Sequence, residues 1–108
     1  METVDKIKQQ IADNAVILYM KGSPKLPQCG FSSRAAQILE ACGAEFAFVD
    51  IIANPDIRAT LPQVANWPTF PQLFINGELV GGSDIISELY DSGELKTMLA
   101  TQLAEGEK

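Results

Sequence analysis

The chain has 108 residues, 46% of them hydrophobic and 20% charged, with 8 Lys and Arg against 14 Asp and Glu. This length and apolar fraction predict one domain spanning residues 1–108 and exclude a disordered or collagen-like chain. The net charge of −6 argues against nucleic acid and membranes as partners, because phosphate binding depends on cationic side chains. The longest apolar run has six residues, whereas a membrane span needs about 20.

The cysteine and histidine content narrows the possible chemistry. There are two cysteines, Cys29 and Cys42, and no histidine. The lack of histidine excludes Ser–His and Cys–His nucleophile pairs and zinc sites that use imidazole. Two thiols cannot form a four-thiolate metal site within one chain, and a secreted disulfide scaffold would hold more of them. These counts favour a reducing, cytoplasmic setting.

The first part of the chain predicts a helix, a strand, a loop and a second helix. Thr3 is placed to cap the first helix, and the uninterrupted apolar run from Ala15 to Met20 is typical of a buried strand. Glycine and proline predict a loop over Lys21–Gln28. A helix follows over Gly30–Ala41, and Gly43 is expected to end it in the left-handed conformation.

The middle of the chain predicts another strand, a helix and a third strand. Phe46–Ile51 has the composition of a strand. Asn54 followed by Pro55 is typical of a helix start, and Pro62 is expected to kink or restart that helix. The third strand is predicted over Gln72–Ile75.

The remaining residues predict a hairpin and two helices. Asn76-Gly77 is a strong two-residue hairpin turn into a fourth strand over Glu78–Gly81. Ser83 or Asp84 is expected to cap the next helix.

Gly93 should separate that helix from a last one, and residues 105–108 are expected to fray. The strand–helix–strand unit requires a parallel pair, and the hairpin adds an antiparallel one. The sequence therefore predicts an α/β fold in which a four-stranded mixed sheet carries helices on both faces.

Cys29 is the residue best placed for chemistry, because it lies where the loop meets a helix. The free N–H groups and the dipole of a helix N-terminus stabilise a thiolate, which is the nucleophilic and metal-binding form. Lys21, at the end of the preceding strand, could add a positive charge. Position alone is also compatible with an unreactive cysteine at a helix cap.

Three blocks of sequence identify a family resemblance. They are Lys21-Gly22-Ser23-Pro24 through Cys29-Gly30-Phe31-Ser32, then Trp67-Pro68-Thr69-Phe70-Pro71-Gln72, then Gly81-Gly82-Ser83-Asp84. In this order and at these strand and helix boundaries, the chain resembles the monothiol glutaredoxin family of the CGFS type. The resemblance covers nearly the whole chain and implies a thioredoxin-like (glutaredoxin) fold, a redox-active Cys29 and the use of glutathione.

The resemblance also implies residues for a glutathione groove. Lys21 and Arg58 would meet the glycyl carboxylate, and Ser83 and Asp84 would bind the γ-glutamyl end at a helix N-terminus. Phe70 would offer its backbone to the glutathione cysteine.

Pro71 resembles the cis-proline of the thioredoxin-like fold. Trp67 and Pro68 are more simply explained as packing residues, although a place beside the groove or at a dimer face stays open.

The motif lacks a second thiol. Ser32 stands where a C-x-x-C motif has its second cysteine, and a hydroxyl cannot displace a disulfide. Cys42 would lie about 20 Å from Cys29 along a continuous helix, whereas disulfides need Cα separations below about 7 Å. We expect Cys42 to be a small core residue. Many family members have cysteine where this chain has Ser83, which further weakens the case for disulfide reduction.

Two functions from different classes follow. The first is a carrier of [2Fe–2S] clusters, which usually take four thiolates. Two Cys29 thiols and two glutathione thiols would complete that set in a homodimer. The resemblance also implies a BolA-like partner and apo iron–sulfur proteins as recipients. The alternative is a glutathione-dependent thiol–disulfide oxidoreductase that removes glutathione from proteins. We favour the carrier, with at most weak enzymatic activity.

Overall fold

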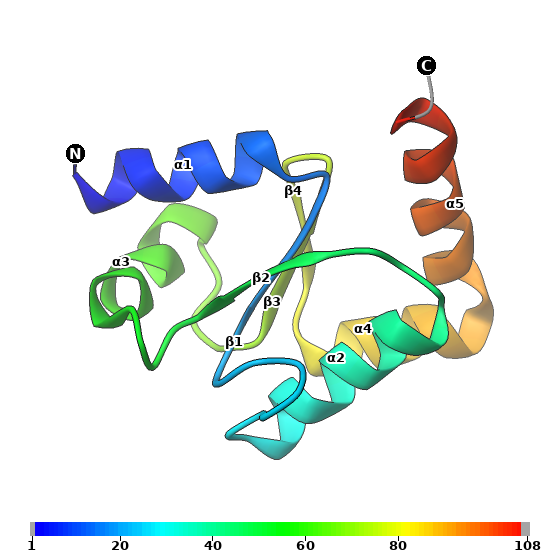
Figure 1. Cartoon of the computed structure of the whole chain (residues 1–108), viewed down its shortest axis with the longest axis horizontal. Helices are drawn as coiled ribbons and strands as arrows, with labels where there is room; N and C mark the ends of the chain where they lie inside the picture. The colour runs from blue at the N-terminus through cyan, green and yellow to red at the C-terminus, as the bar shows by residue number, and fades with distance from the viewer. Residues whose placement is uncertain (1, 107–108) are drawn as a thin grey trace.

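The computed structural model describes residues 2–106, and the side chains of residues 2–100. Helices and strands alternate along most of the chain (Figure 1). In chain order they are α1 (Thr3–Asp13), β1 (Val16–Met20), α2 (Gly30–Ala41), β2 (Ala47–Asp50), α3 (Pro55–Ala65), β3 (Gln72–Ile75), β4 (Glu78–Gly81), α4 (Ser83–Ser92) and α5 (Glu94–Gly106).

The four strands form one mixed sheet in the order β2-β1-β3-β4. β1 pairs with β2 in parallel, while β1–β3 and β3–β4 are antiparallel. The order and directions confirm the predicted mixed sheet with its parallel pair and its hairpin. β1 and β2 are one residue shorter at their N-terminal ends than expected, and β2 also ends one residue earlier.

Helices cover both faces of this sheet. α1 and α3 lie together on one side, and α2, α4 and α5 lie on the other (Figure 1). Alternate residues of β1 point to opposite faces of the sheet. Leu18 and Met20 pack towards α2, and Ile17 and Tyr19 pack towards α1 and α3. Because both faces are covered, all five residues of β1 are buried, as its continuous apolar run predicts.

Turn residues confirm the predicted breaks. Asn76 and Gly77 have φ values of 55° and 81°, which is the geometry of a tight hairpin turn. Gly43 follows the C-cap of α2 with φ of 73°, and Gly93 caps α4 with φ of 85°.

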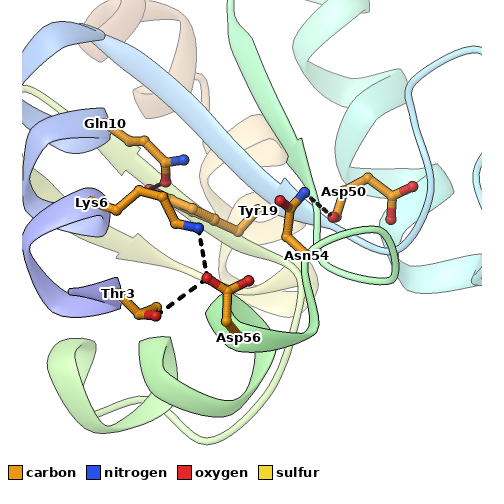
Figure 2. A network of polar contacts seen from close by, with 7 residues as sticks. All are labelled: Thr3, Lys6, Gln10, Tyr19, Asp50, Asn54 and Asp56. Atoms are coloured by element: carbon orange, nitrogen blue, oxygen red, sulfur yellow. Dashed lines mark hydrogen bonds and ion pairs between the residues drawn. The ribbon is translucent and has the colours of Figure 1, made fainter. Parts of the chain in front are cut away.

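The predicted cap at Thr3 is wrong. Glu2 is the N-cap of α1, and Thr3 is its first helical residue. The Thr3 hydroxyl instead donates to Asp56 at 3.2 Å, and Lys6 pairs with the same carboxylate at 2.6 Å (Figure 2). A contact with α3, 53 residues away, therefore decides the role of this side chain.

Ser83 and Asp84 do not cap α4 either. Gly82 is the N-cap, and Ser83 is the first helical residue. A Cβ atom at position 82 would lie 3.2 Å from the Pro71 carbonyl oxygen and 3.5 Å from Trp67 Nε1. Glycine therefore suits this close approach, and α4 begins immediately after it.

Two further expectations concern Pro62 and the C-terminus. Pro62 lies inside α3 and does not restart it. The helix continues to Ala65, and Val64 and Ala65 pack against the core. Of the segment expected to fray, residues 105 and 106 belong to α5, and residues 107–108 lie outside the described part of the chain. Within residues 2–106, no helix is long and apolar enough to cross a membrane.

Candidate functional site

Cys29 is the N-cap of α2 and is only partly buried. The backbone N–H of Ser32 makes the largest contribution that lowers the pKa of the Cys29 thiol, against a smaller opposing effect of burial. The Phe31 N–H, the positive charge of Lys21 and the Ser32 hydroxyl lower it further. This environment favours the thiolate, as the position of Cys29 at a helix N-terminus predicts.

Ser32 is a structural part of the site as well as the substitute for a second cysteine. It is completely buried, and its Oγ accepts a hydrogen bond from the backbone N–H of Lys21 at 3.0 Å. This bond joins the end of β1 to the first turn of α2. The same side chain therefore holds Lys21 in place and faces the Cys29 thiol.

The loop before Cys29 is held at both of its ends. Gln28 N–H donates to the Lys21 carbonyl at 2.9 Å, and Ser23 and Leu26 exchange backbone hydrogen bonds inside the loop. Gly22 has φ of 87°, and a Cβ there would lie 2.5 Å from the Leu26 carbonyl oxygen. Only glycine fits this position without displacing the backbone.

Asp50, at the end of β2, anchors the loop to the sheet. Its Oδ1 accepts N–H groups from Gly22 at 3.0 Å and from Ile52 at 2.9 Å, and Ala53 N–H lies 3.4 Å away. Desolvation would raise the pKa of Asp50, but these donors together lower it. Asn54 donates to the Asp50 carbonyl at 2.9 Å, so the start of α3 is fixed to the same point (Figure 2).

A groove of about 530 Å³ opens at the edge of the sheet where β1 and β4 end and β3 begins. Phe31, two residues after Cys29, is one of its lining residues, so the groove adjoins the start of α2. All five residues predicted to bind glutathione line it: Lys21, Arg58, Phe70, Ser83 and Asp84. The structure brings these residues together, and their role towards glutathione stays a prediction.

The groove has cations on one side and a helix N-terminus on the other. β3 lies between β1 and β4, so the Phe70-Pro71 segment separates Lys21 from Ser83 and Asp84. The first N–H groups of α4 have no intrahelical partner, and Asp84 adds a carboxylate beside them. This arrangement suits a short peptide with a carboxylate at one end and an amino-acid group at the other.

The bond between Phe70 and Pro71 is cis, as the resemblance implies. Sequence reasoning placed Trp67 and Pro68 mainly among packing residues, but both line the groove. It missed Thr69 and Pro62, which also line the groove, although Thr69 belongs to the quoted motif. Within the described residues, no three Asp, Glu, Cys or His side chains are placed to hold a metal ion.

Replacing Ser32 with alanine tests the link between loop and thiol. The Lys21 N–H would lose its partner, which should lower the free energy of unfolding by about 1–3 kcal/mol. The pKa of Cys29 should rise slightly, because the hydroxyl is the smallest of its stabilising influences. Chemical denaturation and the pH dependence of Cys29 alkylation measure the two effects. The control Ser33→Ala, which loses only an exposed contact with Gln37, should change neither.

Comparisons with known proteins agree with this geometry. Residues 16–80 match the Glutaredoxin family model. The chain is 61% identical to "Glutaredoxin 4" of Haemophilus influenzae, over 97% of this chain and 98% of that protein. A monomeric truncated mutant of Trypanosoma brucei 1-C-Grx1 is 40% identical with a TM-score of 0.84, over 94% of this chain and 92% of that one. A buckwheat glutaredoxin–glutathione complex is 26% identical with a TM-score of 0.81, over 93% and 89%.

Proposed function

The chain belongs to the glutaredoxin family, in its monothiol form, and we propose that it binds glutathione and assembles a [2Fe–2S] cluster shared by two copies, for delivery to other proteins. One observation carries the proposal: a single cysteine whose surroundings favour the thiolate adjoins a groove with two cations and a helix N-terminus. The buckwheat relative, with a similar fold, was solved in complex with glutathione.

The ligand count supports a shared cluster. Four thiolates are the usual ligands of a [2Fe–2S] cluster, and Cys42 lies at the opposite end of α2 from Cys29. Each chain therefore contributes one thiolate, and two glutathione molecules in the grooves contribute the other two. The lowered pKa of the Cys29 thiol and its partial exposure suit a metal ligand that faces a second copy.

The groove residues divide the recognition of glutathione between them. Lys21 and Arg58 would bind the glycyl carboxylate, and the Phe70 backbone would pair with the cysteinyl residue. The N–H groups at Ser83 and Asp84 would bind the γ-glutamyl carboxylate, and the Asp84 side chain would bind its ammonium. Together these contacts would direct the glutathione thiol towards Cys29.

The alternative function, removal of glutathione from protein mixed disulfides, has less support. Where the family resemblance implies a second thiol, this chain has Ser32 and Ser83, and Ser32 is buried and hydrogen-bonded to Lys21. Any such reaction would need a second glutathione to release Cys29. We therefore expect slow turnover of glutathionylated substrates.

Anaerobic reconstitution tests the proposed function. The wild-type protein is mixed with iron and sulfide, with and without glutathione, and followed by visible absorption and gel filtration. A coloured dimer that forms only with glutathione is the expected result. A colourless monomer under both conditions would contradict the proposal, as would a coloured species that forms equally well without glutathione.

The cellular context belongs to the same proposal. Apo iron–sulfur proteins would receive the cluster, and a BolA-like protein could replace one copy in a mixed dimer. We place the protein in the cytoplasm, because a free thiol at Cys29 requires reducing conditions.

A further inference from the structure

Gln72 is a polar residue at a position where an apolar one would be expected. It is the first residue of β3, a strand whose four residues are all buried, and its own exposed fraction is 0%. Burying a side-chain amide is costly unless the amide is hydrogen-bonded. Its partners therefore indicate what this residue is for.

Both hydrogens of the Gln72 amide have partners in one short segment. Nε2 lies 3.0 Å from the Trp67 carbonyl oxygen and 3.1 Å from that of Thr69. An amide NH₂ carries two hydrogens, so it can donate one to each carbonyl. Two carbonyl acceptors also fix the orientation of the amide, because its oxygen would be repelled there.

The segment that Gln72 holds forms one wall of the groove. Trp67, Pro68, Thr69 and Phe70 all line the groove, and none of them belongs to a helix or strand. The carbonyls of Trp67 and Thr69 therefore lack the partners that regular structure would supply. Gln72 does not line the groove, so it acts on the groove only through this wall.

The indole side chain of Trp67 is held by packing and not by a hydrogen bond. Its indole N–H is buried and has no hydrogen-bond partner among the described residues. Gly82 lies against it, since a Cβ at Gly82 would be 3.5 Å from Trp67 Nε1. The Trp67 backbone N–H donates to the Pro62 carbonyl at 3.1 Å, and the two bonds from Gln72 are the directional side-chain contacts that hold the rest of the wall.

We propose that Gln72 is a positioning residue for glutathione: its buried amide holds the Trp67–Phe70 wall so that the Phe70 backbone faces the ligand. This inference rests on the proposed function, because it concerns the same groove. Removing the amide should leave a folded protein whose groove binds glutathione weakly.

The test compares Gln72→Met with Asn14→Leu. Met keeps the volume and burial of Gln72 but donates nothing. Asn14 is the matched control, because its amide donates to the Gln10 carbonyl at 2.9 Å at the end of α1 and lines no part of the groove. Both variants lose amide-to-carbonyl bonds, and Gln72→Met also removes the buried Gln72 Oε1, which has no partner among the described residues, so the stability of each variant is measured beside its binding.

Two readouts separate positioning from stability. Titration of the folded proteins with S-methylglutathione, which cannot form disulfides, should show about tenfold weaker binding for Gln72→Met and wild-type binding for Asn14→Leu. Trp67 is the chain's one tryptophan, so acrylamide quenching of its fluorescence reports on the wall. Quenching should change in Gln72→Met alone.

Wild-type affinity and quenching in folded Gln72→Met would overturn the positioning role while leaving the proposed function intact. No binding to the wild-type protein would instead overturn the proposed function, and this inference with it. If Gln72→Met does not fold, amide exchange in the wild type decides: slow exchange of the Gln72 side-chain NH₂ supports the role, and exchange at the rate of a free amide contradicts it.

Discussion

Replacing Cys29 with serine should abolish cluster assembly, whereas replacing Cys42 with alanine should leave it intact. The two thiols lie at opposite ends of α2 and in different environments. Ser32 N–H lowers the pKa of the Cys29 thiol, while burial raises the pKa of the Cys42 thiol. Cys29 lies two residues before the groove residue Phe31, whereas Cys42 lies at the far end of the same helix, so only the loss of Cys29 should remove a ligand of the proposed cluster.

Cys29→Ser is expected to affect cluster assembly, whereas Cys42→Ala is expected to affect only stability. With iron, sulfide and glutathione, Cys29→Ser should stay colourless and monomeric under conditions in which the wild type becomes a coloured dimer. Cys42→Ala should form the coloured dimer and lose about 1 kcal/mol of stability, because Cys42 only packs against the edge of the core.

Visible absorption, gel filtration and chemical denaturation of the three proteins measure these outcomes. A coloured complex formed by Cys29→Ser would show that another group holds the iron. Loss of cluster binding in a folded Cys42→Ala protein would overturn the assignment of Cys42 as a packing residue.

The sheet could be predicted from the sequence because its signals are local. The apolar run of β1 and the Asn76-Gly77 turn each dictate their structure through burial pattern or backbone conformation. The N-caps of α1 and α4 could not be predicted, because contacts between distant segments decide them. The Thr3 side chain of α1 is hydrogen-bonded to Asp56 of α3, and Gly82 precedes α4 where Pro71 and Trp67 leave little space for a side chain.

The candidate site could likewise be predicted only in part, because some of its features depend on contacts between distant segments. The position of Cys29 before a helix predicts a stabilised thiolate, but not that a buried Ser32 hydroxyl joins the thiol to Lys21. The five groove residues come from two loops and two helices that are far apart in the chain, so only the family resemblance groups them in the sequence. The sequence contains one sign of the role of Gln72, because it is a polar residue at the start of an otherwise apolar strand.

Replacing the cations of the groove is expected to have the second large effect on glutathione binding. Glutathione is a net anion, and the chain itself has a charge of −6. Long-range attraction would not explain the proposed binding of glutathione, so local cations would have to. Lys21 and Arg58 line the groove, whereas Lys25 is exposed in the neighbouring loop and does not. A charge-assisted hydrogen bond is worth about 1.5–3 kcal/mol, and less at an exposed rim.

Lys21→Gln and Arg58→Gln should each weaken glutathione binding and shorten cluster lifetime by about tenfold, and Lys25→Gln should change little. Lys21 also lowers the pKa of Cys29, so Lys21→Gln should raise that pKa and slow thiol alkylation at pH values below it, unlike Arg58→Gln. Cluster decay at fixed glutathione and alkylation rates against pH measure the two effects. Because all three variants change net charge equally, equal cluster lifetimes would mean that overall charge, and not the groove, governs recognition.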